Sequence, residues 1–74
     1  MRHNVLIVDD EQLIRQGLRA RIEYLGIDVD EIFEADNGLM ALGIQDEHPI
    51  DLVITDIRMP DMDGLELIQE MQKK

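Results

Sequence analysis

Two short apolar runs stand out because each is followed directly by aspartate. The first run is Val5–Val8 and the second is Leu52–Thr55. Because neither run alternates with polar residues, each predicts a strand that is buried on both faces of a sheet. A third segment, Glu31–Ala35, mixes two glutamates with apolar residues, a pattern that suits a strand at the edge of a sheet.

Segments with helical periodicity separate these strands. Over residues 11–25, apolar side chains recur every three or four positions, which predicts an amphipathic helix, and Gly26 can end this helix as a C-cap. The apolar positions of this helix are Ile14, Leu18, Ile22 and Leu25. Asn37 can cap a second helix over 38–47, and a third helix is expected over 65–74.

The alternation of strands and helices implies an α/β unit with parallel strands and right-handed crossovers. Asp9 and Asp10 follow the first apolar run, and Asp56 follows the second. Ligands of open α/β sheets bind beyond the carboxyl ends of the strands, so we expect these three carboxylates to converge there. Carboxylates held close together repel one another unless a cation binds between them, and Mg²⁺ prefers such oxygen ligands.

A simpler interpretation is that these acids only shape the backbone. Asp9 and Asp10 would then cap the following helix, and Asp56 would begin a turn. Capping requires one acid at each helix start, whereas here a doublet is expected to meet a third acid. The sequence therefore favours a metal site.

Three segments of the chain resemble the receiver domain of bacterial two-component response regulators. They occur in the right order and at the right spacing, and they span nearly the whole chain. The matching segments are Val5–Glu11, Ala35–Gly38 followed by Ala41-Leu42, and Asp51–Gly64. Within the last segment, Ile54–Pro60 is most similar to regulators that carry an AraC-type DNA-binding output domain.

The resemblance implies a fold, a role for each acid and a partner. The fold would be a flavodoxin-like α/β fold with three parallel strands in the order 2-1-3. Asp56 would be the nucleophile that accepts a phosphoryl group from a sensor histidine kinase. Mg²⁺, or Mn²⁺ in its place, would be held by Asp10, Asp56 and the backbone carbonyl of Arg58, with Asp9 steadying bound waters. Such a domain is a phosphoacceptor rather than an enzyme, with at most self-phosphorylation and self-dephosphorylation chemistry.

The resemblance also implies parts that this sequence does not contain. Receivers have five strand–helix units, and residues 1–74 offer three. The Ser or Thr and the Lys that contact the phosphoryl group would come from the fourth and fifth strands. We therefore expect a partial receiver domain, the N-terminal three-fifths of a receiver, that is unable to switch after phosphorylation.

Composition narrows the range of partners. Seventeen acidic and seven basic residues give a net charge of −10, which opposes direct binding to nucleic acids or anionic membranes. The longest fully apolar stretch has four residues, whereas a membrane span needs about 20. There is no cysteine, which excludes disulfides and thiolate metal sites. A cytoplasmic location is the expectation.

Two other functions compete with the receiver interpretation. A phosphatase of the haloacid dehalogenase type also uses a strand-end aspartate, but it places a second aspartate two residues later, where this chain has Arg58. The other possibility is a fragment inactive in phosphorylation that acts as a folding or assembly module. In the order 2-1-3, the strand Leu52–Thr55 lies at an edge without a protecting Lys, Pro or bulge, so we expect self-association through it.

Overall fold

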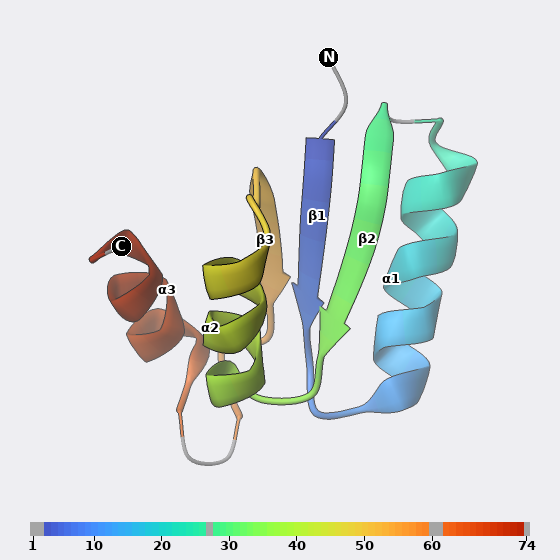
Figure 1. The fold of residues 1–74 in the computed structure, drawn as a ribbon. Helices are drawn as coiled ribbons and strands as arrows, with labels where there is room; N and C mark the ends of the chain where they lie inside the picture. Colours follow the sequence, from blue (N-terminus) through green and yellow to red (C-terminus); the bar gives the residue numbers. More distant parts are fainter. Residues whose placement is uncertain (1–2, 27, 60–61, 74) are drawn as a thin grey trace.

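The computed structural model describes residues 3–26, 28–59 and 62–73. Three strands and three helices alternate along the chain: β1 (His3–Val8), α1 (Gln12–Tyr24), β2 (Val29–Ala35), α2 (Gly38–Glu47), β3 (Leu52–Thr55) and α3 (Gly64–Gln72). All three strands are parallel and lie in the order β2-β1-β3, as the sequence predicts (Figure 1). The expected α/β fold is therefore confirmed.

The register of the sheet brings the strand ends to one level. Val8 at the end of β1 is the partner of Ala35 in β2 and of Thr55 in β3. Each helix begins near this carboxyl edge of the sheet and runs back along the strands (Figure 1). Residues that directly follow the strands are consequently neighbours in space.

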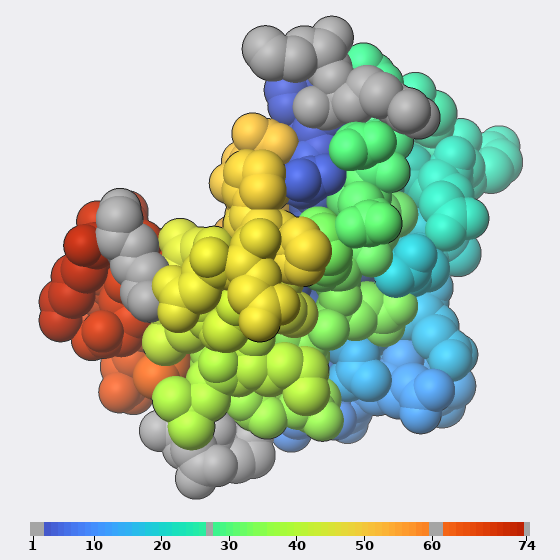
Figure 2. Space-filling model, viewed as in Figure 1, coloured from blue at the N-terminus to red at the C-terminus, as the bar shows by residue number. Residues whose placement is uncertain are grey.

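Each face of the sheet packs against a different set of helices. On one face, Leu6 and Val8 of β1 belong to one buried cluster with Ala41 of α2 and Leu67 of α3. On the other face, Val5 and Ile7 of β1 contact Ile22 of α1. Figure 2 shows the layer formed by α2 and the turn that follows it, with α1 to its right. Because β1 is buried on both faces, its continuous apolar pattern is explained.

The predicted apolar face of α1 is only partly correct. Ile22 is buried and Leu18 is partly buried against the same cluster, whereas Ile14 is 45% exposed and Leu25 is 68% exposed. Within the described residues, α1 therefore packs through Leu18 and Ile22, and the two ends of its predicted stripe are left in contact with solvent.

The observed element bounds differ slightly from those predicted. Helix α2 and strand β3 have the expected bounds, and Asn37 accepts the expected capping bond from the Met40 amide at 2.8 Å. Strand β2 begins two residues earlier than expected, at Val29, and α1 ends at Tyr24, followed by Gly26 with φ of 69°. Helix α3 ends at Gln72; Lys74 lies outside the described residues. Among the described residues, no helix is both long and apolar enough to cross a bilayer.

Candidate functional site

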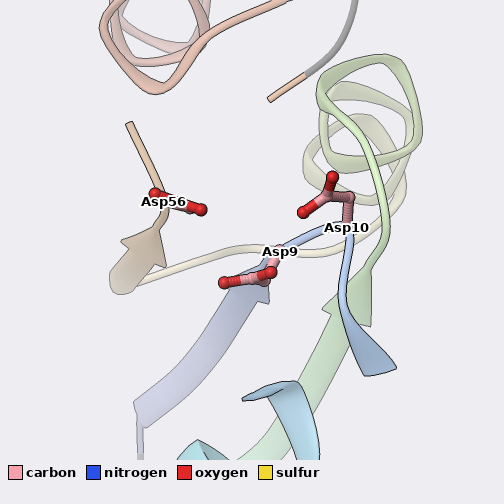
Figure 3. Close-up of side chains that lie close together, drawn as sticks. All are labelled: Asp9, Asp10 and Asp56. Carbon is pink, nitrogen blue, oxygen red and sulfur yellow. The ribbon is translucent and has the colours of Figure 1, made fainter. Parts of the chain in front are cut away.

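Asp9, Asp10 and Asp56 come together at the carboxyl edge of the sheet. One carboxylate oxygen from each residue lies within 4.8 Å of the other two. Figure 3 shows the three side chains facing a common space beyond the ends of β1 and β3. The cause is the register, since Val8 and Thr55 are paired and the residues after them are Asp9 and Asp56. The structure thus brings together the three acids that the sequence singles out.

Asp9 is the best-anchored member of this acidic site. Its side chain is buried, and its Oδ1 accepts a hydrogen bond of 2.9 Å from the Glu11 amide. Its own amide donates to the Ala35 carbonyl at 3.1 Å, which extends the pairing of β1 with β2 by one residue. Asp10 and Asp56 are exposed. The arrangement gives one fixed carboxylate beneath two that an incoming ligand can reach.

Asp56 is held by the backbone around it. Its amide donates to the Val8 carbonyl at 3.1 Å, and its Oδ1 accepts from the Arg58 amide at 3.3 Å. Gly64 at the start of α3 packs directly on this segment, and its amide donates to the Ile57 carbonyl at 2.9 Å. A Cβ at position 64 would overlap the backbone oxygen of Asp56. Glycine is therefore required for α3 to approach so closely.

The donor set of the acidic site fits a hard divalent cation. It consists of carboxylate oxygens close enough to share one ion, and Mg²⁺ and Mn²⁺ bind through such oxygens together with water. The exposure of Asp10 and Asp56 leaves room for those waters and for a substrate oxygen. Within the described ranges, no other group of three such side chains could hold a metal ion.

Other acids near the strand ends lie outside this group. Asp36 follows β2 as Asp56 follows β3, yet its Oδ1 accepts from the Asn37 side chain at 2.6 Å. Asp63 caps α3 by accepting from the Glu66 amide at 2.8 Å. Asp36 is therefore a useful reference, because it occupies an equivalent strand-end position without belonging to the acidic site.

A second polar cluster beside the site is one that sequence reasoning missed. Glu34 of β2 accepts hydrogen bonds from Arg15 Nε at 3.2 Å and from Arg19 Nε at 2.8 Å. The Arg19 hydrogen bond is the main cause that holds the pKa of Glu34 below its usual range; Arg19 charge and Arg15 add to it, while burial opposes it. A signal was present in the sequence, since two arginines four residues apart share a helix face and a glutamate interrupts the apolar part of a strand.

The chain is similar to proteins of known class. It matches the family model of the response regulator receiver domain over residues 5–74. It is 46% identical over 72 residues to the probable transcriptional regulator ycf27 of Cyanidium caldarium, a match that covers 97% of this chain and 28% of the relative. It is 40% identical over 67 residues to the transcriptional regulatory protein HptR of Staphylococcus aureus, covering 90% of this chain and 27% of the relative.

Solved structures agree with this result. A two-component transcriptional regulator AraC from Clostridium phytofermentans matches with a TM-score of 0.89 and 45% identity, over 96% of this chain and 57% of that one. The chemotaxis protein CheY4 of Vibrio cholerae matches with a TM-score of 0.86 and 30% identity, over 99% of this chain and 58% of that one. The expected similarity to AraC-type regulators is confirmed by the first match.

Fold and matches together define the class: this is the receiver module of a two-component system. The chain belongs to the response regulator receiver domain family. It spans just over a quarter of the length of the curated relatives it matches.

Proposed function

We propose that this chain is the phosphoacceptor module of a response regulator and takes a phosphoryl group from a sensor histidine kinase onto Asp56. The observation that carries the proposal is the meeting of three strand-end carboxylates, of which Asp56 is exposed at the end of β3. Residues 1–74 would serve as three strand–helix units of a receiver domain. The family membership supports this role.

In the proposed reaction, a carboxylate oxygen of Asp56 attacks the phosphorus of a phosphohistidine. The new O–P bond forms as the P–N bond breaks, and the imidazole nitrogen leaves with the electron pair and takes up a proton. Asp10, Asp56 and the Arg58 carbonyl would hold Mg²⁺ or Mn²⁺, with the fixed Asp9 steadying bound water. A bound divalent ion would offset the charge on the phosphoryl oxygens, the main need of phosphoryl transfer.

Phosphorylation can be tested with acetyl phosphate and Mg²⁺, with intact mass as the readout. We expect the unmodified chain to gain one phosphoryl group and Asp56→Asn to gain none. Asp36→Asn is the matched control, because Asp36 directly follows β2 as Asp56 follows β3, but lies outside the acidic site. Equal phosphorylation of the unmodified chain and Asp56→Asn would assign the acceptor to another residue.

Exposed leucines support a protein rather than a small molecule as the physiological donor. The second residue of each helix is a leucine, and these residues, Leu13, Leu39 and Leu65, are 81%, 70% and 61% exposed. Every helix begins near the carboxyl edge (Figure 1), so these three leucines lie at the end of the molecule that carries the acidic site. We call the three leucines the apolar rim, and exposed apolar residues of this kind suit docking of another protein.

The rim can be tested by comparing two phosphoryl donors. We expect Leu13→Ser to slow transfer from an autophosphorylated histidine kinase that phosphorylates the unmodified chain, and to leave transfer from acetyl phosphate unchanged. Tyr24→Ser is the control, because Tyr24 is 89% exposed at the opposite end of α1. Equal slowing with both donors would mean that Leu13 affects the acidic site itself.

Self-association is a second proposed role, and the edge strand β3 favours it. In the described residues β3 pairs only with β1, and Leu52 at its start is 48% exposed. At the opposite edge, Arg19 donates from Nη2 to the Ile32 carbonyl of β2 at 2.8 Å, so that edge is partly capped. Two copies could pair β3 with β3 about a two-fold axis, which requires antiparallel pairing. Phosphorylation would be unnecessary for such an assembly module.

A further inference from the structure

Arg15 connects three parts of the molecule through one guanidinium group. It lies on α1, its Nη1 donates to the backbone carbonyl of Asp9 at 2.7 Å, and its Nε donates to Glu34 of β2 at 3.2 Å. The side chain is only 15% exposed although it carries a full charge. A long charged side chain buried to this degree needs specific hydrogen-bond partners, and Nη1 and Nε of Arg15 each have one.

The carbonyl that Arg15 holds belongs to the peptide between Asp9 and Asp10. A peptide unit is planar, so fixing its oxygen also fixes the direction of the Asp10 amide and the path of the chain into Asp10. The other side of Asp9 is already held, because its amide donates to Ala35 and its carboxylate accepts from Glu11. The Arg15 hydrogen bond thus fixes the direction of the backbone from the well-anchored Asp9 to Asp10.

We propose that Arg15 is a positioning residue of the acidic site: by holding the Asp9–Asp10 peptide, it sets where the Asp10 carboxylate, which would hold the divalent ion, lies relative to the Asp9 carboxylate, which would steady bound water. The inference rests on the proposed function of that site. Arg15 does not touch the ion or the phosphoryl group, and it acts only through the backbone.

Glu34 keeps Arg15 in the required orientation. Its Oε1 accepts a hydrogen bond from Arg15 Nε, and its Oε2 accepts one from Arg19 Nε at 2.8 Å. The carboxylate therefore cannot rotate without breaking one of these two hydrogen bonds. Arg19 shares Glu34 but contacts the Ile32 carbonyl rather than Asp9. Lysine carries its three donors on one nitrogen, whereas Arg15 reaches the Asp9 carbonyl and Glu34 from two separate nitrogens. Arginine therefore suits this pair of acceptors better than lysine does.

The test is the affinity of the chain for Mn²⁺, measured by the fall of the free Mn²⁺ signal in electron paramagnetic resonance. Contacts that orient metal ligands from outside the ligand shell change metal affinity by about 10- to 100-fold when removed. We expect Arg15→Met to raise the Kd about tenfold and Arg15→Lys to raise it by a smaller factor. Arg19→Met is the matched control, since it loses the same carboxylate partner, and its Kd should stay within about twofold of the unmodified chain.

The possible outcomes separate this inference from the proposed function. If the unmodified chain fails to bind Mn²⁺, the metal site itself is wrong. If it binds and Arg15→Met binds equally well, the site stands and the positioning role is overturned. Equal losses in Arg15→Met and Arg19→Met would also overturn it, because they would show only a general loosening of α1. Should Arg15→Met not fold, Arg15→Lys decides, and a Kd unchanged from the unmodified chain would overturn the role.

Discussion

The close approach of α3 to the acidic site predicts opposite effects for the same substitution at two glycines. At Gly64, an added Cβ would overlap the Asp56 carbonyl oxygen and lie 3.0 Å from Ile57 Cα. Both obstacles are backbone atoms, so they cannot rotate away. At Gly17, in the middle of α1, an added Cβ would meet nothing within 4 Å other than its chain neighbours and the backbone of its own helix. Gly64→Ala must therefore displace α3, whereas Gly17→Ala changes only the conformational freedom of the chain.

The magnitudes follow from these contacts. Forcing extra volume into a packed position costs about 1–3 kcal/mol, and stretching the hydrogen bond from the Gly64 amide to Ile57 adds about 1 kcal/mol. We expect Gly64→Ala to lower the free energy of unfolding by about 2–4 kcal/mol in total. Gly17→Ala should raise it by about 0.5–1 kcal/mol, the usual preference for alanine inside a helix. For a domain of this size the whole stability is about 4–11 kcal/mol, so both changes are measurable.

Urea denaturation followed by circular dichroism gives both free energies from one type of experiment. Gly43→Ala is a second reference, because Gly43 lies inside α2 and an added Cβ there would likewise meet nothing beyond its own helix and chain neighbours. It should be stabilising by about the same amount as Gly17→Ala. If Gly64→Ala proves as stable as the unmodified chain, the start of α3 does not rest on the backbone of Asp56 and Ile57.

Three further predictions concern the ion, pH and assembly. Saturating Mg²⁺ should raise the free energy of unfolding by about 1–3 kcal/mol in thermal melts, and Asp10→Ala should abolish the gain; a melting temperature indifferent to Mg²⁺ would mean that the acidic site does not bind it. The lowered pKa of Glu34 stabilises the fold fully above the usual glutamate pKa of about 4.3, and this contribution should be lost as the pH falls below that value toward the lowered pKa. Glu34→Gln should make the free energy of unfolding depend less on pH at acidic pH. An unchanged pH dependence would show that the pair of Glu34 with Arg19 adds nothing to stability. Light scattering at micromolar concentration should report about twice the chain mass, and Ile54→Lys should shift it toward the monomer, because a charge on β3 opposes pairing; a stable monomer of the unmodified chain would argue against β3 pairing.

The sheet could be predicted from sequence because its signals are local. The apolar run Leu52–Thr55 and the capping residue Asn37 each mark an element directly, and the corresponding bounds agree with the structure. The start of β2 was missed because its first residues, Val29 and Asp30, carry no clear alternation. Whether the ends of the apolar stripe on α1 are exposed depends on which other elements lie against them, and the periodicity of the sequence does not give this information.

The acidic site could also be predicted, because parallel strands place the residues after them at one edge. The closeness of Asp9 and Asp56 follows once the ends of the two strands and the strand order are predicted correctly. The Arg15 contacts could not be predicted in the same way. Arg15 and Glu34 are 19 residues apart, and their meeting depends on how α1 lies across β2, which no local pattern specifies. The hydrogen bond from Arg15 to the Asp9 carbonyl could form with any residue at position 9, so the sequence there gives no sign of it.

The common starting edge of the three helices also has an electrostatic consequence. Each helix carries the equivalent of about half a positive charge at its N-terminus, a product of aligned peptide dipoles. Since α1, α2 and α3 all begin at the edge that holds Asp9, Asp10 and Asp56, these partial charges gather on the side where a phosphoryl group would arrive (Figure 1). These partial charges offset part of the negative charge of the three carboxylates at this edge. The offset resides in the backbone, so side-chain substitutions that keep the helices leave it in place.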